Sequence, residues 1–358
     1  MRDLVDGVNG TGRNPTSPGP PTRLGSGGPF RFMDTEILVP GSTANLGGGF
    51  DTLGVAVQLY LRARIVEVRH DGGARLEVVS STPPVRGTNA AERAFAAMAR
   101  RATGPVPTVC AAIESDIPMA AGLGSSAAAT VAGLRIFERV TAPLSDTTLL
   151  AAATALEGHA DNAAPALLGG MTSVVESDDA EPRALRWDWP EDLRFVIATP
   201  FTGLATAKAR AALSPEISRK DAIFNLQRVL SLVHALQHGE YDRLREALQD
   251  RWHQPARASL VPHLSAVLAI DDRDVLGAYL SGAGPSVAVI AQRNFERVER
   301  LLEQTCEAAG AAVTVRTLAV HTNLRRDGLE RQDGQEGTFG SSLSSLSRPS
   351  SPTGRRSA

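Results

Sequence analysis

One stretch of this chain limits its possible folds more than any other: a glycine-rich turn that leads directly into a helical pattern made mostly of alanine. The stretch runs from Pro118 to Ala128 and reads PMAAGLGSSAA. Its two glycines permit positive φ angles and a close approach of the backbone to a ligand, and its two serines can cap the helix that follows. Free N–H groups at such a turn, together with the helix dipole, form a site for an anion. An ordinary glycine turn with a serine cap is the alternative interpretation.

The near absence of lysine decides what kind of anion site this can be. The chain has two lysines, Lys208 and Lys220, against 35 arginines, and neither lysine follows a glycine. The P-loop pattern and the lysine-bearing strand of protein kinases are therefore both absent from this sequence. Residues 122–127 do satisfy the dinucleotide fingerprint G-x-G-x-x-A. That fingerprint should follow a strand directly, but residues 115–121 intervene, and Glu138 lies in a helical stretch instead of at a strand end.

Composition gives little reason to expect a macromolecular partner. Basic and acidic residues nearly cancel, 37 against 39, for a formal net charge of −2, so neither nucleic acid nor an anionic membrane is predicted. No apolar run approaches the roughly 20 residues that span a bilayer, and the first residues lack the apolar core of a signal peptide, so a cytoplasmic location is expected. Cys110 and Cys306 have no metal-ligand spacing and are expected to be small core residues. The sequence leaves a homodimer open.

Patterned sequence lies between two polar tails. Residues 1–33 contain seven glycines and five prolines, and residues 323–358 are rich in serine, so both tails are predicted to be disordered. Residues 1–32 are expected to be dispensable, because the first patterned strand follows Met33. Strand patterns come first, helical patterns occupy the middle, and a strand–turn–strand–helix–strand series ends the patterned region, which indicates an α+β fold. A division near residue 195 gives two domains, residues 34–195 and 196–322.

Hydrophobic periodicity predicts the individual elements of this fold. The expected strands are residues 36–40, 55–68, 75–80, 108–114, 193–199, 275–280, 287–291 and 312–320. The expected helices are residues 90–102, 125–140, 147–156, 222–236 and 296–309.

Three further segments combine polar side chains with glycine turns, at residues 40–54, 156–170 and 281–286. In the second segment four polar side chains stand among alanine and leucine, where they are costly unless they are paired or used for function. Each segment alone also fits an ordinary turn. The polar side chains of the first two segments are Asn45, Asp51, Glu157, His159, Asp161 and Asn162.

Taken in order, the four glycine-bearing segments resemble those of the GHMP kinases, the family of galactokinase, homoserine kinase, mevalonate kinase and phosphomevalonate kinase. The Pro118–Ala128 stretch is similar to the family's phosphate-binding signature P-x-x-x-G-L-G-S-S-A, and SGAGPS at 281–286 resembles its third glycine motif. VPGSTANLGGGFDTLG and EGHADNAAPALLGG are most similar to the homoserine kinase branch. The likeness covers about residues 35–320. It implies a two-domain GHMP kinase fold, with an N-terminal domain like domain 2 of ribosomal protein S5 and a C-terminal ferredoxin-like α+β domain.

The resemblance implies a reaction. The γ-phosphoryl group of ATP would pass to the side-chain hydroxyl of L-homoserine, giving O-phospho-L-homoserine for threonine biosynthesis, with Mg²⁺ required. The ATP phosphates would be wrapped by Pro118, Met119, Ala120, Ala121, Gly122, Leu123, Gly124, Ser125, Ser126, Ala127 and Ala128. Ser126 and Glu157 would hold the Mg²⁺ ion.

The same resemblance assigns the acceptor site. Asn45, Asp51, His159 and Asp161 would surround the amino acid, with Asn162 nearest the hydroxyl. Arg210 and Arg257 would clamp its carboxylate, each through the two-bond fork that a guanidinium offers. Asn162 and Arg210 are the expected catalytic residues. An amide cannot accept a proton as an aspartate can, so catalysis by positioning without a side-chain base is expected.

Two other interpretations remain. A GHMP kinase for mevalonate or a sugar would keep the glycine loop, but would prefer aspartate at position 162 and would lack the contexts of the two arginines. A GHMP-fold regulator that binds without catalysis would be expected to have lost Glu157 or the loop serines, and all of these are present.

Overall fold

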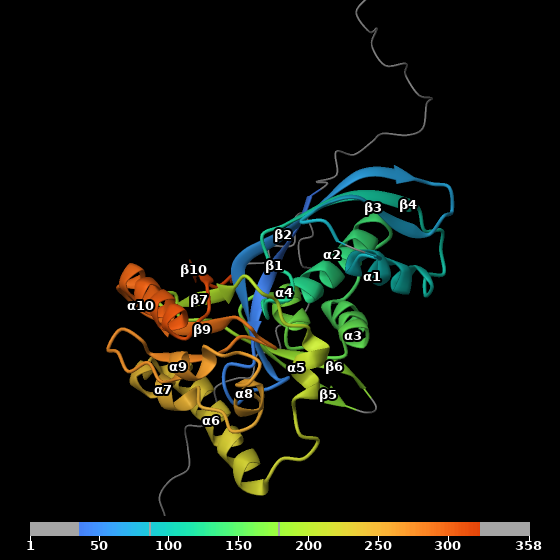
Figure 1. The fold of residues 1–358 in the computed structure, drawn as a ribbon. Helices are drawn as coiled ribbons and strands as arrows, with labels where there is room; N and C mark the ends of the chain where they lie inside the picture. Colours follow the sequence, from blue (N-terminus) through green and yellow to red (C-terminus); the bar gives the residue numbers. More distant parts are fainter. Residues whose placement is uncertain (1–35, 86, 178–179, 323–358) are drawn as a thin grey trace, which may run out of the picture. The chain divides into compact units, whose positions relative to one another are not determined.

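The computed structural model describes residues 36–85, 87–177 and 180–322 (Figure 1). The predicted disorder of the two tails and the dispensability of residues 1–32 fall outside these residues. The described part of the chain forms two β-sheets with helices packed on them, so the fold is mixed α+β, as predicted. None of the helices described is both long and apolar enough to cross a membrane.

The first sheet is organised around one long strand, β2, which pairs with three neighbours. β1 runs antiparallel to β2 with a bulge between Pro40 and Gly41, β4 pairs antiparallel with the second half of β2, and β5 pairs with its first residues. β3 lies parallel to β4, and β6 is antiparallel to β5. The strands are β1 (Glu36–Ala44), β2 (Leu53–Arg69), β3 (Arg75–Thr82), β4 (Thr108–Ser115), β5 (Met171–Ser177) and β6 (Ala180–Trp187).

Four helices accompany this sheet, and α2 is the central one, since it contacts α1, α3, α4 and β1. In Figure 1, α1, α2 and α3 gather on one side of the long β1–β2 pair. α1 begins at a capping box in which the side chains of Asn89 and Glu92 each bind the other's backbone N–H. The helices are α1 (Ala90–Ala99), α2 (Ser125–Val140), α3 (Asp146–Glu157) and α4 (Ala163–Leu168).

The second sheet has the order β10-β7-β9-β8 and is antiparallel throughout. Alternate residues of β7 point to opposite faces: Phe195 and Ile197 join the core shared with the first sheet, whereas Val196 and Ala198 join a second core that includes residues of α10. The strands are β7 (Arg194–Pro200), β8 (Gly277–Leu280), β9 (Val287–Ala291) and β10 (Val313–Leu318). The remaining helices are α5 (Thr206–Ala211), α6 (Arg219–His238), α7 (Leu244–Ala247), α8 (His253–Arg257), α9 (Leu264–Leu268) and α10 (Phe295–Ala308), with a short 3₁₀ turn at Tyr241–Arg243.

Every expected strand and helix has a counterpart, and the structure adds β5, β6 and several short helices. β6 was missed because its sequence, AEPRALRW, carries charges and a proline in place of a clean apolar alternation. α4, α5, α7, α8 and α9 have four to six residues each, too short for a 3.6-residue period to stand out. The division near residue 195 stays a prediction; β7, which begins at Arg194, is the first strand of the second sheet.

The crossing of α1 and α2 gives a test of this packing. Gly133 lies in the middle of α2, where an added Cβ would collide with the backbone of Ala91 in α1. Alanine normally stabilises a helix interior relative to glycine by roughly 0.5–1 kcal/mol. Here we expect Gly133→Ala to lower the free energy of unfolding by about 1–3 kcal/mol, because neither backbone can move easily. Denaturant unfolding measures the change. Gly104→Ala is the control, since nothing lies within 4 Å of that position. A Gly133→Ala variant as stable as wild type would contradict this packing.

Candidate active site

A pocket of about 200 Å³ brings together residues from the loops of both sheets. It is small and partly polar, which suits a compact charged ligand. Residues 120–127 of the glycine loop form one wall. The other expected site residues that line it are Asn45, Asp51, Glu157, His159, Asp161, Asn162, Arg210 and Arg257. Of the expected set, Pro118, Met119 and Ala128 do not line this pocket.

Four consecutive carbonyl groups of the glycine loop are held by other parts of the fold. Each carbonyl of residues 120–123 accepts a hydrogen bond from a different part of the fold. The donors, in the order of their acceptors, are the amide of Leu204 (2.9 Å), the amide of Ser286 (3.2 Å), the hydroxyl of Ser281 (2.7 Å) and the amide of Ser42 (3.1 Å). Because a trans peptide points its N–H opposite to its carbonyl, the N–H groups of residues 121–124 point away from these partners. Ser125 and Ser126 stand in the first turn of α2, where a backbone N–H has no acceptor within the helix. No described residue accepts a hydrogen bond from the amides of residues 123–126. The loop can therefore offer these amides to an anion.

The two glycines are required by this arrangement. Gly122 and Gly124 have φ angles of 77° and 72°, and a Cβ on either would collide with Ser281 or with Ser42. Gly124 is the N-cap of α2 and the helix has no side-chain cap. The expectation that the serines cap the helix is therefore wrong: Ser125 and Ser126 form the first turn, because the left-handed glycine sets the start of the helix one residue earlier.

An oxygen-rich corner lies where α2 and α3 meet. The Ser126 hydroxyl donates to the Glu157 carboxylate over 3.1 Å, and the Thr130 hydroxyl donates to the same oxygen over 2.6 Å. Glu157 is the last residue of α3, which ends at Gly158 with a φ of 79°. Ser126 and Glu157 are on the pocket wall, and hard oxygen donors of this kind are what Mg²⁺ prefers. The residues present therefore fit a magnesium ion.

The segment after α3 is fixed by a chain of hydrogen bonds. His159 Nδ1 lies 2.6 Å from Asp161 Oδ1, and the Asn162 side-chain NH₂ donates to the same oxygen over 3.2 Å. The Ser42 hydroxyl donates to Asn162 Oδ1 over 2.9 Å. These partners set the orientation of the Asn162 amide, which was expected nearest the acceptor hydroxyl.

Asp51 and Arg210 form a two-bond ion pair across the pocket. Both carboxylate oxygens accept from the guanidinium, at 2.7 and 2.9 Å. The backbone of Asp51 is left-handed, with φ of 52°, and that of Asn45 is left-handed too, with φ of 76°. The Asn45 side chain holds this turn, since it accepts from the Asp51 amide over 3.1 Å and donates to the Gly282 carbonyl over 2.8 Å. Such strain in non-glycine residues is common where a site must be held in one geometry.

Arg257 is the most deeply buried charge at the pocket, with 1% of its surface exposed. Its Nε donates to the Ala209 carbonyl over 3.2 Å, and its Nη1 bonds to His253 Nδ1 and to the Gly282 carbonyl over 3.2 and 3.1 Å. Within the described residues Nη2 has no hydrogen-bond partner. Since Nε and Nη1 are used, Arg257 cannot offer the two-bond fork that was expected of it, and it can present only Nη2.

The pocket groups influence one another's proton affinity. The hydrogen bond to Asp161 raises the pKa of His159, and the bonds to Asp51 raise the pKa of Arg210. Burial, and then the nearby charge of Arg210, lower the pKa of Arg257. Two cationic groups thus share one side of the pocket at a cost that an anion between them would offset.

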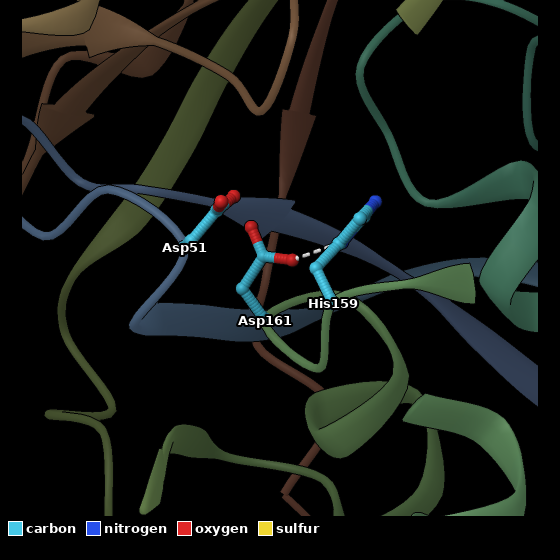
Figure 2. Close-up of side chains that lie close together, drawn as sticks. All are labelled: Asp51, His159 and Asp161. Carbon is cyan, nitrogen blue, oxygen red and sulfur yellow. Dashed lines mark hydrogen bonds and ion pairs between the residues drawn. The ribbon is translucent and has the colours of Figure 1, made fainter. Parts of the chain in front are cut away.

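Asp51, His159 and Asp161 place two carboxylates and an imidazole close together at the pocket (Figure 2). One donor atom from each lies within 4.8 Å of the others, and Figure 2 shows the two carboxylates facing the same space. Such a group can hold a cation. Both oxygens of Asp51 already contact Arg210, so a divalent metal ion would lie beside a guanidinium. An ammonium group, with one charge and three N–H donors, is the cation that fits better.

A second cavity of about 330 Å³ adjoins the first and shares Ala120, Ser125 and Ser126 with it. Its other lining includes apolar side chains, among them Val85 and Met119, which are 42% and 50% exposed. The glycine loop therefore separates a polar pocket from a partly apolar one.

Several side chains that help to build the pocket were given no role by the sequence analysis of the motifs: Phe50, Ser42 and Thr130. Phe50 lies under the two cationic groups, with its ring centre 5.7 Å from Arg210 Cζ and 5.2 Å from Arg257 Cζ. Ser42 and Thr130 orient Asn162 and Glu157. Phe50 stands directly before Asp51 in a quoted motif, so the motif contained a signal for it. Ser42 stands in the same motif, whereas nothing in the sequence points to Thr130, whose partner is 27 residues away.

Comparison with known proteins identifies the family of this chain. The family described as "GHMP kinases N terminal domain" matches residues 89–170, and "GHMP kinases C terminal" matches residues 232–311. The homoserine kinase of Solibacter usitatus is 36% identical over 302 residues, 82% of this chain and 96% of its own length. The homoserine kinase of Deinococcus radiodurans is 42% identical over 253 residues, which are 70% of this chain and 82% of its own length. The crystal structure of homoserine kinase from Cytophaga hutchinsonii matches with a TM-score of 0.71 and 25% identity, over 81% of this chain and 96% of that one.

A two-domain α+β fold with a lysine-free glycine loop at the start of a helix defines a class of ATP-dependent kinases that act on alcohols. The chain belongs to that class, the GHMP kinase family, and the three relatives named above are homoserine kinases.

The His159–Asp161 pair predicts a pH-dependent contribution to stability. The pKa of His159 is raised in the folded protein, so its contribution is complete below the unfolded value of 6.5 and is lost as pH rises through the folded value. We expect wild type to lose its stability advantage over His159→Asn as pH rises from about 5.5 to 8.5. Urea unfolding of both proteins across this range measures the difference. A difference that does not change with pH would contradict the assignment.

Proposed function

We propose that this chain transfers the γ-phosphoryl group of ATP to the side-chain hydroxyl of L-homoserine and so forms O-phospho-L-homoserine. One observation carries the proposal. The pocket has the N–H face of the glycine loop on one wall, and a carboxylate group beside two guanidinium groups at its other end. The N–H groups suit phosphate, and the carboxylate beside the guanidinium groups suits a zwitterionic amino acid.

The glycine loop is proposed to bind the ATP phosphates through the amides of residues 123–126. These donors are fixed before ATP arrives, because the carbonyls on the opposite side are already bonded. Fixed dipoles aimed at a transferring phosphoryl group stabilise its charge without reorganisation. The adjoining cavity, with Val85 and Met119 on its wall, is proposed to take the nucleoside.

Ser126 and Glu157 are proposed to hold Mg²⁺, which when bound neutralises charge on the ATP phosphates. The side chains supply two oxygen atoms of the hardness this ion requires. Thr130 donates to Glu157 and keeps the carboxylate turned toward Ser126.

The acceptor is proposed to bind by its two charges. Its ammonium group would contact Asp51 and Asp161, and its carboxylate would contact the Arg210 guanidinium and Nη2 of Arg257. Asp51 and Arg210 now bond to each other, so an incoming zwitterion would replace each partner with a group of the same charge. A molecule with only one of the charges would leave one member of the pair without a partner, which is costly in a partly buried site.

Catalysis is proposed to rest on alignment. Asn162, held by Ser42 and Asp161, would position the acceptor oxygen in line with the γ-phosphate, and phosphoryl transfer requires little else from protein groups. A homodimer and a cytoplasmic location stay predictions, which sedimentation of the purified chain and fractionation of cells would decide.

The acceptor assay tests the function directly. With ATP and Mg²⁺ present, we expect ADP release with L-homoserine to exceed that with mevalonate or galactose by at least about a hundredfold in kcat/KM, since neither alternative carries both charges. A coupled assay measures ADP, and a reaction without acceptor gives the background. Faster turnover of mevalonate or galactose than of homoserine would refute the assignment.

The metal site predicts a selective kinetic change. We expect Ser126→Ala and Glu157→Gln each to raise the Mg²⁺ concentration for half-maximal rate by about tenfold or more, because the first removes a hydroxyl ligand and the second replaces a charged carboxylate with a neutral amide. Initial rates across a magnesium titration at fixed ATP measure the change. Glu246→Gln is the control for the loss of one negative charge, since Glu246 pairs with Arg228 and is exposed. An unchanged magnesium requirement in both site variants would exclude these ligands.

A further inference from the structure

His253 is a fully buried imidazole directly behind the acceptor side of the pocket. It is the first residue of α8, and Arg257 is the last residue of the same helix. Its Nε2 lies 2.8 Å from the Gly47 carbonyl oxygen, and its Nδ1 lies 3.2 Å from Arg257 Nη1. The ring stacks on Phe50 with 5.3 Å between ring centres. The mechanism proposed above gives His253 no part.

The two partners of His253 determine its protonation state. A carbonyl oxygen can only accept, so Nε2 must carry the proton. A guanidinium can only donate, so Nδ1 must have its lone pair free. The ring is therefore neutral, in the Nε2–H form. A second proton on Nδ1 would place two donors and two positive charges face to face, and burial also lowers the pKa of this ring.

These two hydrogen bonds join the segments that build the acceptor site. Gly47 belongs to the turn that carries Asn45 and Asp51, and its position leaves no room for a Cβ against the backbone of Leu248. Arg257 bonds onward to Ala209, next to Arg210 in α5, and to the Gly282 carbonyl, which also binds Asn45. His253 thus bonds both to the turn that carries Asp51 and to Arg257. These are the groups that would bind the ammonium and the carboxylate of the acceptor.

We infer that His253 is a positioning residue for the acceptor site, and this inference rests on the proposed function. By accepting from Nη1 it turns Arg257 so that Nη2 is the nitrogen presented to the acceptor carboxylate. By donating to Gly47 it holds the turn that presents Asp51. The side chain of Asp250 is fully buried, with Oδ2 3.6 Å from Nε2. It balances the charge of Arg257 from behind and accepts from the amides of Trp252 and Gln254.

Two substitutions each remove one of the hydrogen bonds of His253 and keep the other. Asparagine places its Oδ1 where Nδ1 of the ring stands, so His253→Asn keeps the acceptor for Arg257 and loses the donor to Gly47. Glutamine places its Nε2 where the ring Nε2 stands, so His253→Gln keeps the donor to Gly47 and loses the acceptor for Arg257. Both leave a cavity, and the shorter asparagine leaves the larger one.

Steady-state kinetics and urea unfolding of the three proteins test the inference. We expect His253→Gln to raise the KM for homoserine by about tenfold to a hundredfold, as for loss of a hydrogen bond to a charged group. The KM for ATP should stay within about twofold, since His253 lies away from the glycine loop. His253→Asn should raise the homoserine KM less than His253→Gln does, although it should be the less stable variant. A homoserine KM that follows the loss of stability, or a homoserine KM unchanged in both variants, would overturn the inference.

A spectroscopic measurement on wild type decides the inference even if neither variant folds or homoserine is not the acceptor. Nitrogen-15 chemical shifts of the His253 ring report which nitrogen carries the proton. We expect a protonated Nε2 and an unprotonated Nδ1 at neutral pH. A charged ring, or a proton on Nδ1, would remove the hydrogen bond from Arg257 and refute the positioning role. Absence of homoserine turnover by wild type with the expected tautomer would instead count against the proposed function alone.

Discussion

The buried guanidinium of Arg257 is the contact on which the rest of the site depends. A charge that is 1% exposed is tolerated only where it is paired or fully hydrogen-bonded. Arg257 satisfies this condition with three acceptors. Two are carbonyls of other segments, one in α5 and one in the turn after β8. The third is the ring of His253 in its own helix, which also binds the Gly47 turn. Removing the guanidinium would take this donor from the Ala209 carbonyl and from the imidazole at the same time, and would leave Gly282 with Asn45 as its remaining donor.

The glycine loop is likewise held in place by hydrogen bonds to distant segments of the chain. Its carbonyls are bonded to segments from β1, from the β7–α5 connection and from the turn after β8, so the loop is held by the fold and not by its own sequence alone. Left-handed backbone at Asn45, Asp51 and Ala120 shows that strain concentrates around the pocket. Strained residues persist where surrounding contacts over-determine them, and here those contacts are the hydrogen bonds of Asn45 and of the loop carbonyls. The result is a set of donors and charges oriented before any ligand binds.

The sequence predicted the longer strands and helices because their apolar residues alternate or recur at helical spacing, as in the helix at residues 222–236. It could not predict α8, a five-residue helix, although this helix carries both His253 and Arg257. Motifs identified which residues belong to the site but not how they pair. The fork of Arg210 was expected for a substrate carboxylate and bonds to Asp51, a partner 159 residues away. The fork of Arg257 was expected too, but its use depends on three acceptors that only the folded chain brings together.

The proposed acceptor site recognises a zwitterion through the charges of Asp51, Arg210 and Arg257. The most direct measurement compares kcat/KM for L-homoserine, for 3-aminopropan-1-ol, which lacks the carboxylate, and for 4-hydroxybutyrate, which lacks the ammonium group. Loss of one charged contact in a partly buried site costs on the order of 2–5 kcal/mol, and each 1.36 kcal/mol is a factor of ten in rate. We therefore expect each analogue to be poorer than homoserine by about 30-fold or more. An analogue phosphorylated as efficiently as homoserine would contradict the account.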